Sequence, residues 1–389
     1  MTSEVSFTVV SDTEAFRALE ADWRDLCGRA EPHSIFLKFD WQWRAWQHVA
    51  AARGYGLRIL AGRVGERLVL IWPLVLNRRL VRFLCSEKFE YRGALVERGP
   101  LASEWLAAAW RQTRRLAGGD AVDLRNLPAD SRLAGFLEGA AGRGRRRSAG
   151  SPVIRLNRFA GWDDYAASLP KGLLSDQQRQ WRRLKKASDR HQFHVVDEAG
   201  EIDALVDWIF THKLAWAAKR GIATGVFSTA EYRAFIRAVL HDSLAAGNLV
   251  LCRLGAKEQI LSAGFGFIDG RRFIFYMFSY DEAYQTFSPS RLLMERLIRR
   301  CMEMGLDTFD FLPGNEAYKR IWADSEDRVV DHLIPTTLLG HGWIAATTHF
   351  AGRGAAWDWL MALYRAAPLG IRRALRRRWL WPIDRYSTS

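Results

Sequence analysis

Residues 309–322 read FDFLPGNEAYKRIW, and this stretch decides how the rest of the chain is interpreted. The apolar run at its start is typical of a short buried strand, and the Pro-Gly pair behind it predicts a turn. Two opposite charges and a phenol then follow within a few residues, at Glu316, Lys319 and Tyr318. Polar groups crowded directly behind a buried strand indicate a special position in the fold.

Length, composition and charge exclude several classes of protein. With 389 residues, 49% of them hydrophobic, the chain can bury one large core or two domains, so it is not a disordered protein. The formal net charge of +14 favours an anionic partner such as phosphate, nucleic acid or an acidic membrane surface. The four cysteines form no C-x-x-C pair, which argues against a disulfide framework or a zinc ribbon and fits a reducing, cytoplasmic setting.

The first part of the chain has the apolar patterns of an α/β unit, with helical spacing, alternating runs and turn residues in succession. In chain order we expect two helices within residues 14–49, a hairpin of strands over 57–60 and 67–75, a strand near 82–85, a helix over 103–116 and a strand over 121–127.

The second part repeats this order. In chain order we expect helices over residues 201–220 and 229–246, strands over 248–254, 259–268 and 272–280, a helix that ends at Gly305, and the strand at 309–311. The segments LRILAGRVGERLVLI and LVLCRLGAKEQILSA agree in apolar pattern and in the place of their turn. This agreement predicts two related α/β domains.

The run GRGRRRSAGSP at residues 142–152 has no apolar residue able to anchor a core, and we therefore place a domain boundary there. The resulting division is an N-terminal domain over 1–150, a second domain over 151–340, and a basic amphipathic helical tail over 341–389.

Three features of the second part together resemble a known family: the acidic-aromatic loop YDEAY at 280–284, the helix start SPS at 288–290, and the stretch 309–322. They resemble the GCN5-related N-acetyltransferase (GNAT) fold, and the tandem order is similar to the Fem-type (FemAB-like) aminoacyl transferases and the CelD-like acyltransferases of bacterial exopolysaccharide synthesis. The resemblance is sharp over 153–335 and diffuse before it. One departure is Ser290, where the family usually has glycine.

The resemblance implies an α/β protein of two tandem GNAT-like domains, each a mixed β-sheet flanked by helices. The second domain would carry the donor cleft, and the first, degenerate domain would form the acceptor side. The implied activity is N-acyl transfer from acyl-CoA or an acyl carrier protein, used as co-substrate, to a small-molecule amine in envelope polysaccharide or lipid biosynthesis, without a metal.

Two other functions stay open. One is Fem-like transfer from aminoacyl-tRNA, which is the less favoured donor and would show as a ribonuclease-sensitive activity. The other is a non-catalytic role in exopolysaccharide assembly, which would gain support if no thioester were bound or consumed.

For the donor, the resemblance implies that its phosphates bind at the start of the helix after the fourth strand, where free amides and the helix dipole favour anions. This place corresponds to residues 285–291, and the candidate binding residues are Gln285, Ser288, Ser290 and Arg291. A plainer interpretation is that Ser288 only caps the helix, with a proline as the first helical residue. Both interpretations use the same exposed amides.

For catalysis, the resemblance implies that the strand at 309–311 ends beside the thioester, so that the residues behind it line the cleft. Glu316 is then a candidate base for the incoming amine, and Tyr318 a candidate acid for the departing thiolate. Lys319 is a candidate for orienting Glu316 or for binding an anionic group of the substrate.

Asp310 is a further candidate, because strand alternation turns it away from its two phenylalanine neighbours, either to water or into the cleft. The alternative for the whole segment 316–322 is an ordinary amphipathic turn. In that case Tyr318 and Trp322 pack on the core and the charges are solvated.

Two basic segments suggest partners. Residues 177–190 predict a basic helix that is a solvated face, a contact for tRNA, or a contact for an acidic acyl carrier protein. Residues 369–381 combine arginines with apolar anchors, which suits peripheral contact with an anionic inner membrane. Alternatively, Ile371, Leu375 and Trp379, spaced by four, pack that helix onto a domain. The N-terminus lacks the features of a signal sequence, and no stretch reaches the roughly 20 apolar residues of a membrane span.

Overall fold

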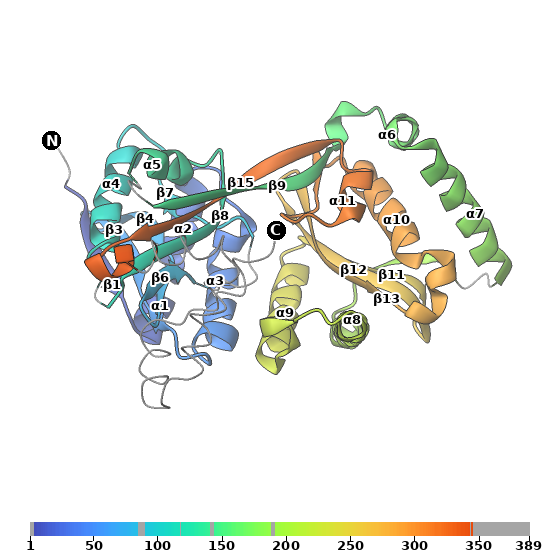
Figure 1. Cartoon of the computed structure of the whole chain (residues 1–389), viewed down its shortest axis with the longest axis horizontal. Coiled ribbons are helices and arrows are strands. Elements are labelled where there is room, and N and C mark those ends of the chain that lie inside the picture. Colours follow the sequence, from blue (N-terminus) through green and yellow to red (C-terminus); the bar gives the residue numbers. More distant parts are fainter. Residues whose placement is uncertain are drawn as a thin grey trace.

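The computed structural model describes residues 4–84, 90–116, 118–140, 144–187, 191–342 and 344. Its described strands form a four-stranded sheet and an eleven-stranded mixed sheet, with helices packed against them (Figure 1). The expected α/β class is therefore confirmed. The segment 369–381 lies outside the described residues, so the expected membrane contact stays a prediction. None of the described helices is both long enough and apolar enough to cross a bilayer.

The first half of the chain contains the expected helices, hairpin and strands, divided more finely than the sequence predicts. Its elements are β1 (Ser6–Val10), α1 (Thr13–Ala18), α2 (Glu20–Arg29), η1 (Ile35–Leu37), α3 (Phe39–Ala45), η2 (Trp46–Ala50), β2 (Gly56–Leu57), β3 (Ile59–Val64), β4 (Arg67–Trp72), β5 (Leu74–Asn77), β6 (Leu80–Phe83), β7 (Leu95–Val96), α4 (Ala102–Thr113), β8 (Ala121–Pro128), α5 (Arg132–Ala140) and β9 (Arg145–Arg155).

The second half matches the expected order closely, because its apolar periodicity is strong. Its elements are η3 (Leu156–Arg158), α6 (Trp162–Ser168), α7 (Lys171–Ala187), β10 (Phe193–Val196), α8 (Ala199–Lys219), η4 (Gly225–Ser228), α9 (Ala230–Ala245), β11 (Leu249–Ala256), β12 (Gln259–Asp269), β13 (Arg272–Tyr280), η5 (Glu282–Phe287), α10 (Pro289–Glu303), β14 (Thr308–Asp310), α11 (Ala317–Trp322) and β15 (Ser325–Pro335).

The two halves exchange strands. Strand β9, which ends the first half, pairs with β14 of the second half, and strand β15, from the end of the second half, pairs with β8 of the first. The two exchanged strands also pair with each other over nine residue pairs, and Figure 1 shows them crossing together between the two bodies.

The domain boundary that the sequence analysis places at residues 142–152 falls within a strand over most of its described part, since residues 145–152 belong to β9. Side chains 146–149 are exposed, so backbone hydrogen bonds to β15 rather than apolar burial hold this part of the strand. A strand held in this way carries no hydrophobic signal in the sequence.

The repeat that the sequence suggests is visible in the register of the parallel strands. Strands β6 and β8 pair in parallel over three residues each, ending with Arg82 opposite Asp123. Strands β13 and β14 also pair in parallel over three residues each, ending with Ile274 opposite Asp310. In each half the helix between the two strands, α4 or α10, connects them as a crossover.

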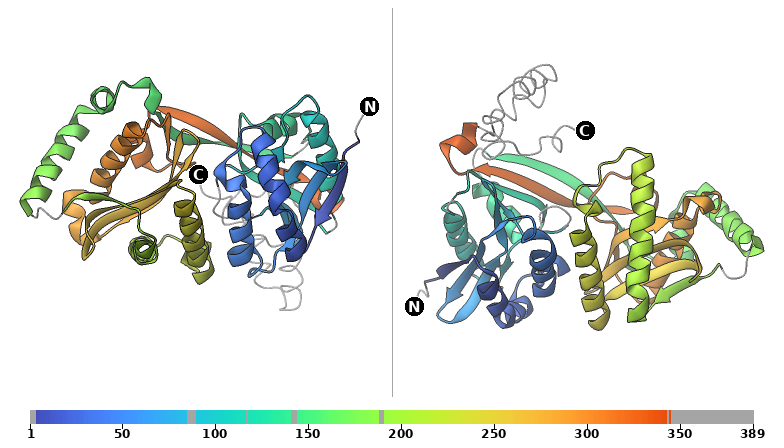
Figure 2. Two further views of the ribbon diagram at one scale, coloured as in Figure 1. Left: turned by 180° about the vertical axis from the view of Figure 1, so that it is seen from behind. Right: turned by 90° about the horizontal axis from the view of Figure 1, so that it is seen from below.

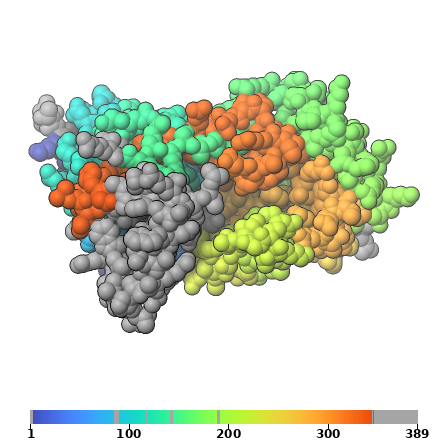
Figure 3. Space-filling model, in the orientation of Figure 1, coloured from blue at the N-terminus to red at the C-terminus, as the bar shows by residue number. Residues whose placement is uncertain are grey.

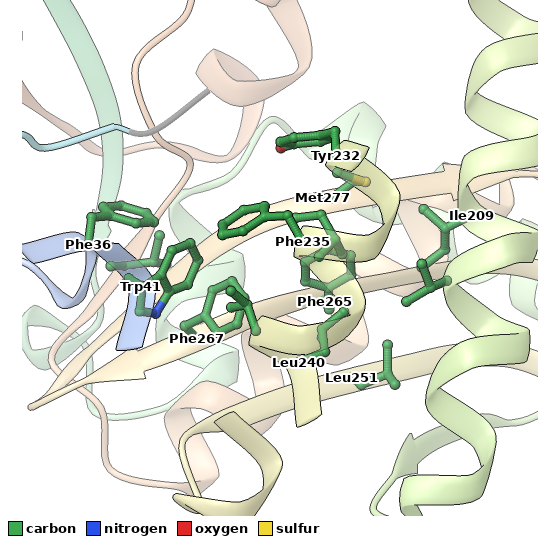
Figure 4. Packing of buried hydrophobic residues seen from close by; sticks show 14 of the residues in the cluster. Phe36, Trp41, Ile209, Tyr232, Phe235, Leu240, Leu251, Phe265, Phe267 and Met277 are labelled. Carbon is green, nitrogen blue, oxygen red and sulfur yellow. The ribbon is translucent and has the colours of Figure 1, made fainter. Parts of the chain in front are cut away.

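Helices cover both faces of the sheet in the second half (Figure 2). Helices α8 and α9 pack on one face together with η1 and α3 of the first half, and α7 and α10 pack on the other. In the first of these cores the indole of Trp41 contacts the rings of Phe235 and Phe267, with centroids 5.9 and 4.9 Å apart (Figure 4). Arg44 also forms an ion pair of 2.7 Å with Asp242. These contacts tie the two halves into one packed unit.

Gly266 of β12 provides a test of this packing. A Cβ atom there would lie 2.3 Å from the carbonyl oxygen of Ile274 and 2.4 Å from the ring of Phe273. We expect Gly266→Ala to lower the free energy of unfolding by about 1–3 kcal/mol, because β12 and β13 must separate. Urea denaturation measures this. Gly172→Ala in α7, where a Cβ meets nothing within 4 Å, is the control and should leave stability unchanged or higher. Equal effects of the two changes would contradict the close packing of β12 against β13 at Gly266.

Candidate active site

Strands β13 and β14 separate after their three parallel pairs. β14 ends at Asp310, whereas β13 continues to Tyr280 and pairs there with β12 only. The pairing of β12 with β13 also shifts by one residue at Tyr276, which forms a bulge at the point of separation. Within the described part of the chain, residues 275–280 therefore have no partner strand on the side of the gap, and this edge can hydrogen-bond an extended ligand.

The turn after β14 is braced by a buried lysine. Lys319 is 4% exposed, and its Nζ donates to the carbonyl oxygens of Leu312 at 3.0 Å and Pro313 at 3.2 Å. The same Nζ lies 2.9 Å from a carboxylate oxygen of Glu316. The ammonium is thus held by two backbone hydrogen bonds and one ion pair. The alternative in which both charges of this segment are solvated is wrong for Lys319.

Glu316 precedes the short helix α11 and keeps its carboxylate largely in solvent, with the side chain 57% exposed. Tyr318 is more buried: its ring packs edge-on against Phe278 of the free part of β13, with centroids 5.4 Å apart, and against Phe311. Burial, with the Glu316 charge as a smaller cause, raises the pKa of Tyr318 well above its usual value. Its hydroxyl is thus protonated at neutral pH.

Asp310 is a correction to the sequence-based expectation, because it faces neither water nor the cleft. Its carboxylate is fully buried, accepts hydrogen bonds of 2.8 Å from the Tyr91 hydroxyl and from the backbone N–H of Leu312, and pairs with Arg272. Burial raises its pKa, and Arg272 and Tyr91 oppose that rise. Tyr91 in turn lies 2.6 Å from the hydroxyl of Ser151. The group joins the two halves and has no contact surface left for a substrate.

The sequence contained one signal for this network. A carboxylate between two phenylalanines in a buried strand needs a cationic partner, and Arg272 starts the neighbouring strand. Nothing in the sequence pointed to Tyr91, which lies 219 positions from Asp310. The first half repeats the pair, since Asp123 occupies the position equivalent to Asp310 and forms a buried ion pair of 3.2 Å with Arg82.

On the donor side, Ser288 precedes α10 with Pro289 as the first helical residue, as expected. Ser288 has a left-handed backbone, with φ of 52°, and its side chain does not cap the helix. Its hydroxyl instead accepts a hydrogen bond of 2.9 Å from Arg291, whose guanidinium also forms an ion pair of 2.6 Å with Asp176 of α7.

The other two donor candidates lie within this same turn. Gln285 is exposed in η5, and its carbonyl oxygen accepts from the N–H of Ser288 at 3.0 Å. Ser290 is half-buried in the first helical turn, where amides have no partner within the helix. The structure thus brings the four donor candidates together, and it brings together Glu316, Tyr318 and Lys319. No group of three His, Cys, Asp or Glu side chains among the described residues is arranged to hold a metal.

The sheet face opposite α10 carries polar groups that the sequence did not suggest. Lys213 of α8 donates a hydrogen bond of 3.3 Å to the carbonyl of Phe278 and lies 5.4 Å from the centre of its ring. The hydroxyls of Tyr232 and the bulged Tyr276 lie 2.9 Å apart. The space-filling view shows the surface hollowed between α8, in yellow-green, and the orange segment that contains α11 (Figure 3).

A comparison with protein families decides the kind of domain. Residues 175–320 match the family model described as an acetyltransferase (GNAT) domain. This part of the chain is therefore similar to a GNAT acetyltransferase domain. The matched range includes most of α7 together with β13, β14 and the braced turn, and a domain of this kind makes the protein an acyltransferase. No curated protein matches the chain.

Solved structures extend the likeness across both halves. FemX is 11% identical, with a TM-score of 0.53, over 84% of this chain and 96% of its own. L-PGS from Bacillus licheniformis is 10% identical, with a TM-score of 0.53, over 86% and 97%. A protein of unknown function from Bacteroides thetaiotaomicron is 12% identical, with a TM-score of 0.52, over 84% and 100%. At these identities the likeness shows the fold alone, and it confirms the expected resemblance to GNAT and Fem-type proteins at that level.

Proposed function

We propose that the protein is an N-acyltransferase that moves an acyl group from the thioester of CoA or of an acyl carrier protein to an amine. The observation that carries this proposal is the separation of β13 and β14 beside the start of α10. The amides of a pantetheine arm can pair with the free edge at 275–280, while its phosphate meets the first turn of α10. The thioester would then lie near the turn braced by Lys319.

The residues of this turn have complementary roles in the proposed reaction. The carboxylate of Glu316 takes a proton from the amine as its nitrogen bonds to the thioester carbon, and the carbon–sulfur bond breaks. The hydroxyl of Tyr318 gives its proton to the departing sulfur. Lys319 orients Glu316; its burial and its contacts with two backbone carbonyls and Glu316 argue against the alternative role of binding an anionic substrate group.

The first half would form the acceptor side, because α3 and η1 pack next to β12 and β13. An amine on a sugar, amino acid or lipid precursor would enter there, and envelope polysaccharide or lipid synthesis is the setting we favour. Transfer from aminoacyl-tRNA stays a second candidate, since the basic helix α7 lies beside η5, where Arg183 donates to the Thr286 carbonyl at 3.0 Å.

Thiol release tests the proposed function. Purified protein is incubated with a panel of acyl-CoA and acyl-carrier thioesters and with mixed amines, with and without ribonuclease. We expect amine-dependent release of thiol together with an acylated product found by mass spectrometry, unaffected by ribonuclease. Transfer that occurs only from aminoacyl-tRNA would mean that the donor is a charged tRNA and not a thioester. A lack of transfer from every donor would favour the non-catalytic assembly role.

Ser290 allows the donor site to be tested separately. Ser290→Gly should bind CoA as well as or better than the wild type, because the smaller residue lets a phosphate approach the helix amides. Ser290→Leu should weaken CoA binding by about tenfold or more by blocking that approach. Isothermal titration calorimetry measures both. Equal affinity of the wild type and the leucine variant would mean that this helix start does not bind the donor.

A further inference from the structure

A groove of about 700 Å³ lies between α6, α7 and α10, on the side of the second half that faces away from the first half (Figure 1). Its floor is formed by apolar and aromatic side chains, among them Trp162, Ala166, Leu174 and Trp181. Neither the proposed reaction nor the contacts between the halves use this groove.

The rim of the groove is cationic. Helix α7 contains six basic residues and one acidic residue. Arg182 and Lys185 of this helix are exposed at the rim, and Arg296 lies over Trp181 at 4.6 Å. Within the part of the chain that the structure describes, none of these three cations has a carboxylate partner.

The acidic side chains at the groove do not cancel this charge. Glu295 is buried, accepts a hydrogen bond of 3.0 Å from Trp181, and forms an ion pair of 2.9 Å with Arg299. Asp163 is exposed in the first turn of α6. The groove therefore combines an apolar floor with positive charge that no carboxylate of the described residues pairs.

The groove adjoins the proposed donor site through shared residues. Gln177, which lines the groove, donates a hydrogen bond of 3.1 Å to the backbone carbonyl of Arg291, and its neighbour Asp176 forms the ion pair with the Arg291 side chain. Gln177 is 2% exposed, and its Oε1 has no hydrogen-bond partner. One helix, α7, thus borders both the groove and the first turn of α10.

We propose that this groove is the docking site for an acidic helical protein that delivers the acyl group on a phosphopantetheine arm. This inference rests on the proposed function, and it specifies an acyl carrier protein as the donor. An apolar floor with tryptophans is typical of the centre of a protein interface, and the cations around it complement an acidic helix. A nucleic acid is less well matched, because apolar side chains form much of the lining where a run of phosphates would need cations.

The test uses the full chain and a fluorescently labelled acyl carrier protein in its phosphopantetheine form. The double variant Arg182→Glu/Lys185→Glu reverses two exposed rim charges, and we expect it to weaken carrier binding by at least about tenfold in fluorescence anisotropy. Ala167→Trp, at an exposed position lining the groove, should weaken binding without changing charge. Arg111→Glu/Arg115→Glu at the end of α4 is the matched control and should bind like the wild type.

Kinetics separate this inference from the proposed function. The groove variants should raise KM for the carrier-linked thioester and leave kcat/KM for the corresponding acyl-CoA unchanged. Equal carrier binding by wild type and groove variants would overturn the docking site while the transferase proposal stands. Absence of transfer from both donors would overturn the proposed function. In that case the anisotropy measurement alone would decide whether the groove binds the carrier protein. Loss of tRNA binding in the same variants, with no carrier binding by the wild type, would assign the groove to RNA.

Discussion

Asp310→Ala is expected to lower the free energy of unfolding by about 3–5 kcal/mol, the range found when one partner of a buried ion pair is removed. The change leaves the charge of Arg272 without its buried partner and removes the acceptor of the Tyr91 hydroxyl. It acts where β13, β14 and β9 meet and where the two halves are joined. Urea denaturation followed by circular dichroism measures the loss.

The neighbouring pair of Arg271 and Asp307 is the control for this prediction. The side chain of Arg271 is 68% exposed and that of Asp307 is 34% exposed. The distance from Nε of Arg271 to Oδ2 of Asp307 is 2.7 Å. Asp307→Ala should change stability by less than about 1 kcal/mol, because water solvates the charge that is left. If Asp310→Ala were as mild as Asp307→Ala, the buried network would not contribute to joining the halves.

Glu316→Gln is expected to slow acyl transfer by about 10²-fold or more with little change in donor affinity, as the loss of a general base predicts. The glutamine has nearly the same shape and can still contact Lys319, so the turn should keep its structure. Steady-state kinetics with saturating donor, alongside calorimetric titration of CoA, separates turnover from binding.

Glu303→Gln serves as the control, because Glu303 is an exposed carboxylate at the end of α10, paired only with Arg300 at 3.5 Å. Its turnover should match that of the wild type. Unchanged turnover in Glu316→Gln would remove this residue from the mechanism, and a large loss of donor affinity would place it in the donor site instead.

The sequence predicted most helices and strands because their signals are local. The strand at 272–280 and the helix that ends at Gly305 follow from apolar periodicity and turn residues, and both are found. The exchange of β9 and β15 was not predictable in the same way. It depends on pairs such as Val153 with Ser325, which are far apart in the chain and leave no periodic pattern.

The sequence named the residues of the candidate site, but it did not predict how their side chains are placed. The sequence grouped Glu316, Tyr318 and Lys319 as candidates; in the structure Lys319 pairs with Glu316, and the ring of Tyr318 packs against Phe278. It did not indicate that Lys319 would be buried, because the acceptors that make burial favourable are backbone carbonyls, which every residue carries. Asp310 turned inward for a similar reason: its partners Tyr91 and Arg272 come from other parts of the chain.

The central claim is that the gap between β13 and β14 holds the acyl donor. Hydrogen–deuterium exchange of the full chain, with and without a saturating thioether analogue of acyl-CoA, tests it most directly. We expect slower exchange at amides within 275–280 and 288–292, and at the turn after β14, in the presence of the analogue. Saturation binding that leaves these segments unprotected, or protection confined to the first half of the chain, would contradict the claim.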